Sequence, residues 1–191
     1  MVGCIRRSTG LQETSGKVVI VISPIPKFVL TAVFIFAGWT LLYDLYILPD
    51  GRFETFLSVT SVSLAATILK VFGTEVESSG RIISCLGSKA VQVNNGCNGF
   101  QLIGLYSGFI IAYPGNWISR VLLLISGISL LLFANVIRIS FFAIFNSSFP
   151  EHWDIAHDAS SYIFFYPIVL SLWYVWTIIS GENSLLKKQL N

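Results

Sequence analysis

The sequence predicts an α-helical polytopic membrane protein with four spanning helices, an interfacial helix and a short extracytoplasmic β-hairpin. Of the 191 residues, 54% are hydrophobic and 12% are charged, whereas about a quarter of the residues in soluble domains are charged. A soluble domain of this size leaves much of its surface in water, so hydrocarbon must be part of the solvent and the lipid bilayer a partner. The net charge of +2 is too small and too scattered to indicate a nucleic-acid partner.

Four apolar runs predict the spanning helices, each of which needs about 20 residues to cross the hydrocarbon. The turn signal Pro114-Gly115 separates the second run from the third. Neighbouring helices can accommodate Pro167 inside the fourth run. We therefore expect one membrane-embedded domain over residues 28–180, flanked by cytoplasmic tails at 1–27 and 181–191. The four runs are Phe28–Leu48, Phe100–Tyr113, Trp117–Phe149 and Ala159–Ile179.

The segment 55–73 is long enough to cross the membrane, but it contains six Ser or Thr residues and Lys70. Its apolar residues fall on one helical face, as in a helix that lies in the membrane interface. These apolar residues are Leu57, Leu64, Ile68 and Val71. A crossing at this segment would give five spans, the alternative to four.

Charge placement favours four spans, because basic residues concentrate on cytoplasmic loops. With four spans, the basic residues of both tails share one side with Arg120, whereas five spans would separate the two tails. The tail residues are Arg6, Arg7, Lys17, Lys27, Lys187 and Lys188. The opposite side then collects Asp50, Glu54, Glu75, Glu77, Glu151, Asp154 and Asp158.

The one sizeable outside loop, residues 74–96, contains the predicted β-hairpin. Residues 81–85 and 89–93 are rich in Ile and Val, and Leu86-Gly87-Ser88 separates them. Two such runs around a short turn are typical of a hairpin.

Arg138 lies inside the apolar run from Leu130 to Phe142. A charge in the centre of a span costs about 2.5–3.5 kcal/mol and therefore indicates function, unless the side chain only extends to the interface. Ser119 precedes Arg138 by 19 residues, about 28 Å of helix, so we expect Arg138 at the outer interface. Asn135, one helical turn earlier, should bond to Arg138 or to its partner.

Cys97 opens the second predicted span, and His157 directly precedes the last one. Glycines on both sides of Cys97 let another backbone approach closely, and a helix N-terminus favours a thiolate. A thiol, a guanidinium and an imidazole thus lie on three helices at the same depth. Alternatively, Cys97 is a small buried apolar residue or pairs with Cys85 in a disulfide, and His157 is an ordinary interfacial side chain.

Three blocks of the sequence, in this order, resemble the signature blocks of the exosortase/archaeosortase family. They are Asn-Gly-Cys-Asn-Gly-Phe at 95–100, Asn-Val-Ile-Arg-Ile at 135–139 and His-Asp-Ala-Ser-Ser-Tyr-Ile-Phe-Phe at 157–165. The chain looks closest to the short exosortases of the XrtF type. His157 fits the third block better than His152 does.

The resemblance implies a membrane-embedded cysteine transpeptidase or protease of the bacterial cytoplasmic membrane. Members of the family recognise a C-terminal sorting signal on a secreted protein, which consists of a short motif, one transmembrane helix and a basic cluster. They cut near the motif at the extracytoplasmic face and transfer the new C-terminus to an acceptor, here unknown.

The catalytic residues that this resemblance implies are Cys97, Arg138 and His157. Cys97 would attack the scissile carbonyl and form a thioester, and His157 would transfer the protons. Arg138, which stays charged, would hold the thiolate or the developing oxyanion.

The supporting residues that we expect are Asn135, Asn98, Gly99 and Asp158. Asp158, or Asp154 in its place, could tune His157. No metal or other cofactor is expected, because the isolated Cys and His residues lack ligand spacing.

Two other functions stay open. A non-catalytic membrane scaffold or assembly subunit would use Arg138 to bind an acidic partner or a lipid. A thiol–disulfide carrier would need both Cys85 and Cys97, although the absence of a C-x-x-C pair disfavours it.

Overall fold

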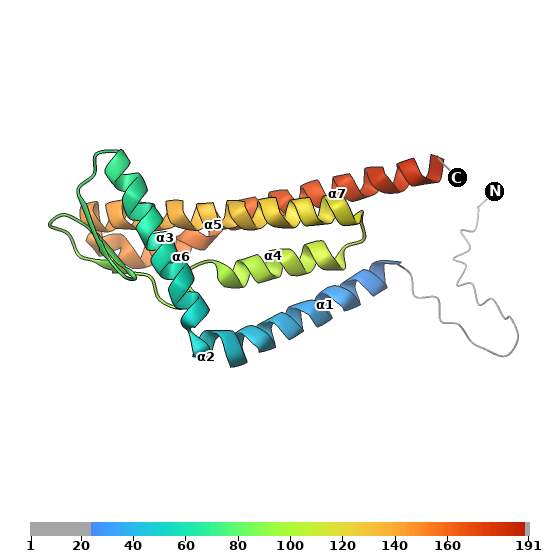
Figure 1. Cartoon of the computed structure of the whole chain (residues 1–191), viewed down its shortest axis with the longest axis horizontal. Coiled ribbons are helices and arrows are strands. Elements are labelled where there is room, and N and C mark those ends of the chain that lie inside the picture. Colours follow the sequence, from blue (N-terminus) through green and yellow to red (C-terminus); the bar gives the residue numbers. More distant parts are fainter. Residues whose placement is uncertain (1–23, 190–191) are drawn as a thin grey trace, which may run out of the picture.

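The computed structural model describes residues 24–189, with side chains from 27 to 181. Four helices run along the long axis of the molecule (Figure 1): α1 (Pro24–Leu42), α4 (Phe100–Ala112), α5 (Trp117–Ser148) and α7 (Tyr166–Gln189). The start of α1, the turn between α4 and α5 and the end of α7 lie at one end of the molecule, and the sheet lies at the other. Most of the two expected cytoplasmic tails falls outside the described side chains, and α7 continues through the second tail to Gln189.

Helix α3 (Arg52–Val71) lies across these four helices at the end that carries the sheet (Figure 1). In the described part of the chain, the helices long and apolar enough to cross a membrane cover Lys27–Asp50, Arg52–Val71, Trp117–Ser148 and Pro150–Gly181. By length and composition, α3 could therefore cross a membrane. Helix α4, the expected second span, has 13 residues and a length of only about 20 Å, which is shorter than the hydrocarbon layer. The transverse orientation of α3 fits the interfacial helix that the charges favour. The chain is therefore a helical, multi-pass membrane protein.

The first span changes its helical geometry before it ends. Helix α1 continues as the π-helical segment η1 (Tyr43–Ile47) and the short α2 (Leu48–Asp50). Gly51, with φ at +65°, then turns the chain into α3. This turn brings the start of α3 beside Tyr43, which is buried.

The outside loop forms a three-stranded antiparallel sheet rather than a two-stranded hairpin. Its strands are β1 (Val76–Ser79), β2 (Ile82–Cys85) and β3 (Val91–Gln92), in the order β1-β2-β3. Strands β2 and β3 are the two arms of the expected hairpin. The sequence of β1, Val-Glu-Ser-Ser, has a single apolar residue and one buried position, so it lacks the alternating pattern that identifies a strand.

Two clusters of buried apolar side chains hold the molecule together. The first lies between the sheet, α3 and α5: Val62, Ala65, Ala66, Leu69, Val76, Ile83, Cys85, Val91, Val93, Val136, Ile139, Phe142 and Ala143. The second joins α4, α5 and α7 along the spanning bundle: Ile103, Tyr106, Ile110, Leu131, Ala134, Phe165, Val169 and Trp176. The boundary between the two clusters falls along α5 near Asn135.

The last predicted span is broken in two. After the short η2 (Pro150–His152), α6 (Trp153–Phe164) ends at Phe165, and α7 begins at Tyr166. Pro167 has no backbone N–H to donate to the carbonyl of Ile163 and so interrupts the helix at this point. We expected a continuous helix here; the break instead makes His157 part of a separate helix.

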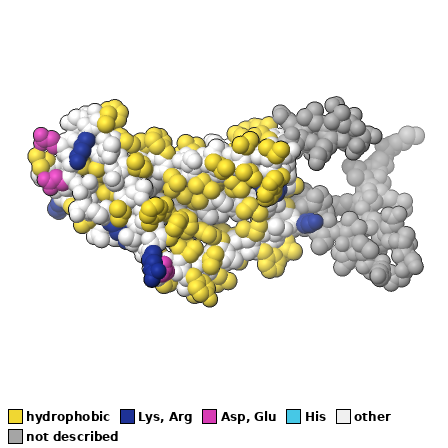
Figure 2. All heavy atoms as spheres, in the orientation of Figure 1, with side chains coloured by type: hydrophobic (Ala, Val, Ile, Leu, Met, Phe, Trp, Pro, Cys, Tyr) yellow, Lys and Arg dark blue, Asp and Glu magenta, His cyan; other side chains and the backbone are white. Residues whose placement is uncertain are grey.

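Charged and apolar side chains occupy different parts of the surface (Figure 2). Apolar side chains cover the helices, and acidic ones gather at the end with the sheet. Many large apolar residues of α1 are more than half exposed, Phe34 at 70% among them. Such exposure is expected for a helix whose outer face contacts lipid.

Candidate active site

Cys97 lies in a tight turn directly before α4. Gly96 and Gly99 on either side of it both have a φ near +80°, a backbone conformation that only glycine adopts at little cost. The Cys97 N–H donates to the Asn94 carbonyl (3.1 Å). The helix itself begins at Phe100, so Cys97 precedes α4 by one turn and does not open it as expected.

The carboxylate of Glu54, in the first turn of α3, holds the Cys97 turn on both sides. Its Oε2 accepts hydrogen bonds from the Gly96 N–H (2.8 Å) and from Asn98 Nδ2 (2.7 Å). Its Oε1 accepts from the Tyr43 hydroxyl (2.8 Å). Glu54 is fully buried, and all three partners are donors, so they compensate a carboxylate for the loss of water.

From the sequence, Glu54 is expected only as one of the acidic residues of the outer side. Its position at the start of an amphipathic helix is typical of a solvated or capping acid. The contacts join residues more than forty positions apart, and no local pattern signals such a pairing. The role of Asn98 becomes clear at the same time: its Oδ1 accepts from the Phe100 N–H (3.1 Å) while its amide nitrogen donates to Glu54.

Arg138 reaches the Cys97 turn from α5 and is buried, with 5% of its surface exposed. It does not extend to the interface to reach water. Its Nη1 donates to the Cys97 carbonyl (3.2 Å) and its Nε to Ser160 Oγ on α6 (3.0 Å). The guanidinium carbon lies over the rings of Phe142 (5.1 Å) and Phe165 (5.3 Å). Within the described side chains, no carboxylate forms an ion pair with Arg138.

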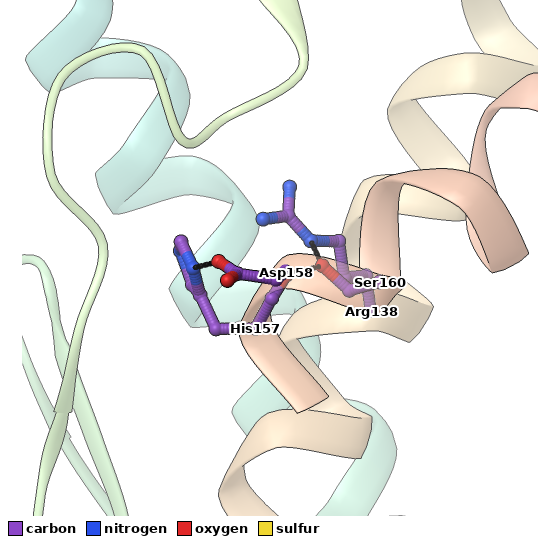
Figure 3. Close-up of polar contacts among 4 residues, drawn as sticks. All are labelled: Arg138, His157, Asp158 and Ser160. Carbon is purple, nitrogen blue, oxygen red and sulfur yellow. Dashed lines mark hydrogen bonds and ion pairs between the residues drawn. The ribbon is translucent and has the colours of Figure 1, made fainter. Parts of the chain in front are cut away.

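His157 lies on α6 close to Arg138, and both side chains project from neighbouring helices toward the same side (Figure 3). Ser160 joins them, because its hydroxyl donates to the His157 carbonyl (2.6 Å) while its oxygen accepts from Arg138. The imidazole packs against the rings of Phe142 and Trp153, each with ring centroids 6.0 Å away. His157 Nδ1 lies 3.4 Å from Asp158 Oδ1, and the Asp158 side chain is 86% exposed.

Two cavities meet at these side chains, and Cys97, Arg138 and His157 line both of them. The sheet-side cavity, of about 160 Å³, lies between β3 and helices α5 and α6. Its other lining residues are Val91, Gln92, Val93, Asn94, Ile139, Phe142 and Trp153. The helix-side cavity, of about 250 Å³, lies between α4 and the break between α6 and α7. Its other lining residues are Gly96, Gly99, Gln101, Leu102, Ser161, Phe165 and Tyr166.

Asn135 is fully buried, but it forms no hydrogen bond with Arg138 or with the groups that Arg138 binds. Its Nδ2 donates to Ser61 Oγ on α3 (3.2 Å), which ties α5 to the transverse helix beside the Cys97 turn. The expected pairing rested on helical spacing alone, and Arg138 instead uses its donors on Cys97 and Ser160.

Cys85 and Cys97 are both free, which disagrees with a disulfide between them. The Cys85 thiol is buried under the sheet and donates to the Ala143 carbonyl (3.4 Å). Among the described residues, no three His, Cys, Asp or Glu side chains lie close enough together to hold a metal ion. Cys97, in contrast, is partly exposed and faces both cavities.

A known protein family matches most of this chain. The family described as transmembrane exosortase matches the chain over residues 27–174, more than half of its length. The match concerns the family as a whole and does not distinguish the short XrtF-type members. No curated protein and no solved structure gives a significant match.

Proposed function

The chain belongs to the transmembrane exosortase family, and we propose that it is a membrane-embedded cysteine transpeptidase. It cleaves a C-terminal sorting signal from a secreted protein at the extracytoplasmic face of the bacterial inner membrane and transfers the new C-terminus to an acceptor. One observation supports this proposal most: Cys97, Arg138 and His157 come from three separate segments and line the same two cavities.

In the proposed reaction, the Cys97 thiolate attacks the scissile carbonyl, and a new C–S bond forms as the C=O π electrons move to oxygen. Collapse of this intermediate breaks the C–N bond, and protonated His157 gives its proton to the leaving amine. The product is a thioester between Cys97 and the substrate. The acceptor nucleophile then gives its proton to His157 and attacks the thioester, which releases the Cys97 thiolate.

Arg138 supplies the positive charge for this chemistry. It is buried and has no carboxylate partner among the described side chains, so its charge is available to an anion in the cavities. A buried guanidinium stabilises a thiolate or an oxyanion more strongly than an exposed one does, because less water screens the interaction. Its bond to the Cys97 carbonyl also fixes where that turn lies.

Asp158 orients the imidazole in this proposal, since Asp158 Oδ1 and His157 Nδ1 face each other at 3.4 Å and leave Nε2 for proton transfer. The exposure of Asp158 makes this interaction weak, since exposed ion pairs contribute only about 0–1 kcal/mol. We therefore assign Asp158 a minor role and Cys97, Arg138 and His157 the main ones.

The experiment that tests the proposal measures processing in the native host. A secreted reporter would carry a sorting signal of the type that the family recognises, and cleavage would be followed by its change in mass. We expect Cys97→Ala to fold and to abolish cleavage, and Arg138→Lys to reduce it strongly because an ammonium lacks the planar, fixed set of donors with which the guanidinium binds Ser160 and the Cys97 carbonyl at once. Normal cleavage by Cys97→Ala would refute the proposal and leave the scaffold function.

A further inference from the structure

The sheet has one edge that faces the candidate catalytic residues. Strand β3 is at the end of the order β1-β2-β3, so one of its sides pairs with no other strand within residues 24–189. The sheet-side cavity is lined by the consecutive residues Val91, Gln92, Val93 and Asn94 and by no residue of β1 or β2. The cavity therefore lies along the outer edge of β3, between that edge and helices α5 and α6.

Hydrogen bonding shows which main-chain groups this edge offers. The Val93 N–H donates to the Arg81 carbonyl (2.9 Å), so Val93 points its main-chain groups toward β2. In an antiparallel pair the direction alternates from one residue to the next. Gln92, which lies opposite Ile82, therefore directs its N–H and C=O away from β2, toward the side of the cavity.

The two cavities also differ in where they lie relative to the membrane. The sheet-side cavity is bounded by residues of β3, and the sheet lies at the end of the molecule opposite the turn between α4 and α5 (Figure 1). The helix-side cavity is bounded by residues of α4 and of the break between α6 and α7, such as Gln101 and Tyr166. A substrate whose transmembrane helix follows the scissile bond thus has its outer, preceding segment on the side of β3.

We propose that the free edge of β3 binds the extended segment that precedes the scissile bond as a fourth strand of the sheet. This inference rests on the proposed function. The N–H and C=O of Gln92 bind one residue of the peptide, and the peptide then leads across the cavity to Cys97. Main-chain pairing of this kind gives affinity for any extended peptide, while Phe142 and Trp153 on the opposite wall favour apolar side chains.

The test uses a peptide electrophile, acetyl-Ala-Ala-Ala chloromethyl ketone, and compares it with chloroacetone. In both reactions the thiolate sulfur displaces chloride, so a C–S bond forms as a C–Cl bond breaks. The protein is purified in detergent with Cys4→Ala and Cys85→Ala, which leave Cys97 as its one thiol. We expect the peptide to label Cys97 at least roughly tenfold faster than chloroacetone, as two main-chain hydrogen bonds would provide.

Three further probes each carry one N-methyl group on a different alanine nitrogen. Gln92 pairs with one residue of the peptide, and a strand directs every second N–H toward its neighbour, so we expect methylation to slow labelling at the alanine that pairs with Gln92 and to have little effect at the adjacent positions. A uniform effect of the three methyl groups, or no advantage of the peptide over chloroacetone, would overturn the strand proposal. These probes require no change in the sheet.

A pair of variants tests the same edge from the protein side. Gln92→Pro removes the main-chain N–H at the free edge, where proline is tolerated in a sheet, and should abolish the advantage of the peptide probe. Gln92→Ala keeps that N–H and should retain the advantage, which is measured within each variant as the ratio of the two labelling rates. A Cys97 that reacts with neither reagent would instead contradict its assignment as the nucleophile, and with it the proposed function.

Discussion

The Glu54 carboxylate gives the sharpest prediction about the site, because it joins α3 to both sides of the Cys97 turn. The variant Glu54→Gln has nearly the same shape but carries no charge and has only one acceptor oxygen. The present carboxylate accepts from Tyr43, Gly96 and Asn98. A carbonyl in the place of Oε2 can still accept from Gly96 and Asn98, while the amide nitrogen must face Tyr43.

The expected loss of stability in Glu54→Gln follows from these three hydrogen bonds. Hydrogen bonds to a charged group contribute about 1.5–3 kcal/mol each and neutral ones about 0.5–1.5 kcal/mol. Loss of the charge therefore costs about 1 kcal/mol per bond, so we expect a decrease of about 3 kcal/mol in the free energy of unfolding. For a chain of this size, this decrease corresponds to a lower thermal midpoint by roughly 6–12 °C.

Two measurements separate positioning of Cys97 from general stability. The first is the thermal midpoint in detergent, and the second is the rate at which iodoacetamide labels Cys97 well below that midpoint. We expect Glu54→Gln to change both, because the turn that carries Cys97 loses its charged anchor. Tyr43→Phe, the matched control, removes a bond to the same carboxylate without touching the turn and should lower only the midpoint. Equal labelling rates in wild type and Glu54→Gln would refute this reasoning.

Three further predictions concern glycine and cysteine positions. Gly99→Ala should lower the free energy of unfolding by about 1–2 kcal/mol for the positive φ and by more for the contact with Phe165, because its Cβ would lie 3.1 Å from the ring. The control Gly73→Ala has the same φ of +80° and open space around its Cβ, so it should show only the cost of the positive φ. Equal thermal midpoints for the two variants would contradict the contact with Phe165. Gly104→Ala should lower the thermal midpoint because its methyl group would overlap the Trp39 indole and separate α1 from α4. The control Gly38→Ala places its methyl group where no atom lies within 4 Å, so the thermal midpoint should stay unchanged or rise slightly. Cys85→Ala should retain reporter cleavage, because the proposed mechanism uses Cys97 alone; loss of cleavage in a folded variant would favour the thiol–disulfide carrier.

Much of the fold could be predicted from the sequence, because the membrane restricts it strongly. Long apolar runs can only be helices where no water is present to satisfy the backbone. In the structure the first run is helical through α1, η1 and α2, the second and third are α4 and α5, and the last is divided between α6 and α7. One feature could not be predicted in this way. Strand β1 has no apolar alternation, and it forms because it pairs with β2, from Val76 opposite Cys85 to Ser79 opposite Ile82.

Less of the candidate site could be predicted. An arginine and a histidine in an apolar chain are conspicuous, because the membrane makes such residues costly, and Cys97 is conspicuous because glycines lie on both sides of it. Their detailed partners depend on contacts between distant segments: Asn135 binds Ser61, and Arg138 binds Ser160 and the carbonyl of Cys97. Helical spacing indicates which residues share a face, but it does not indicate which of several possible acceptors a side chain will reach.

The shortness of α4 has a consequence for the surrounding lipid. Its 13 residues cover about 20 Å, about 10 Å less than the hydrocarbon thickness of a typical bilayer. Lipids next to this helix must thin to match it, or the Cys97 turn must lie below the level of the headgroups. In both cases the depth of the Cys97 turn in the bilayer depends on the length of the lipid acyl chains. The thickness of the membrane therefore determines how deep a substrate must enter before it reaches Cys97. The same protein in nanodiscs of shorter and longer lipids would therefore expose this turn to water to different extents.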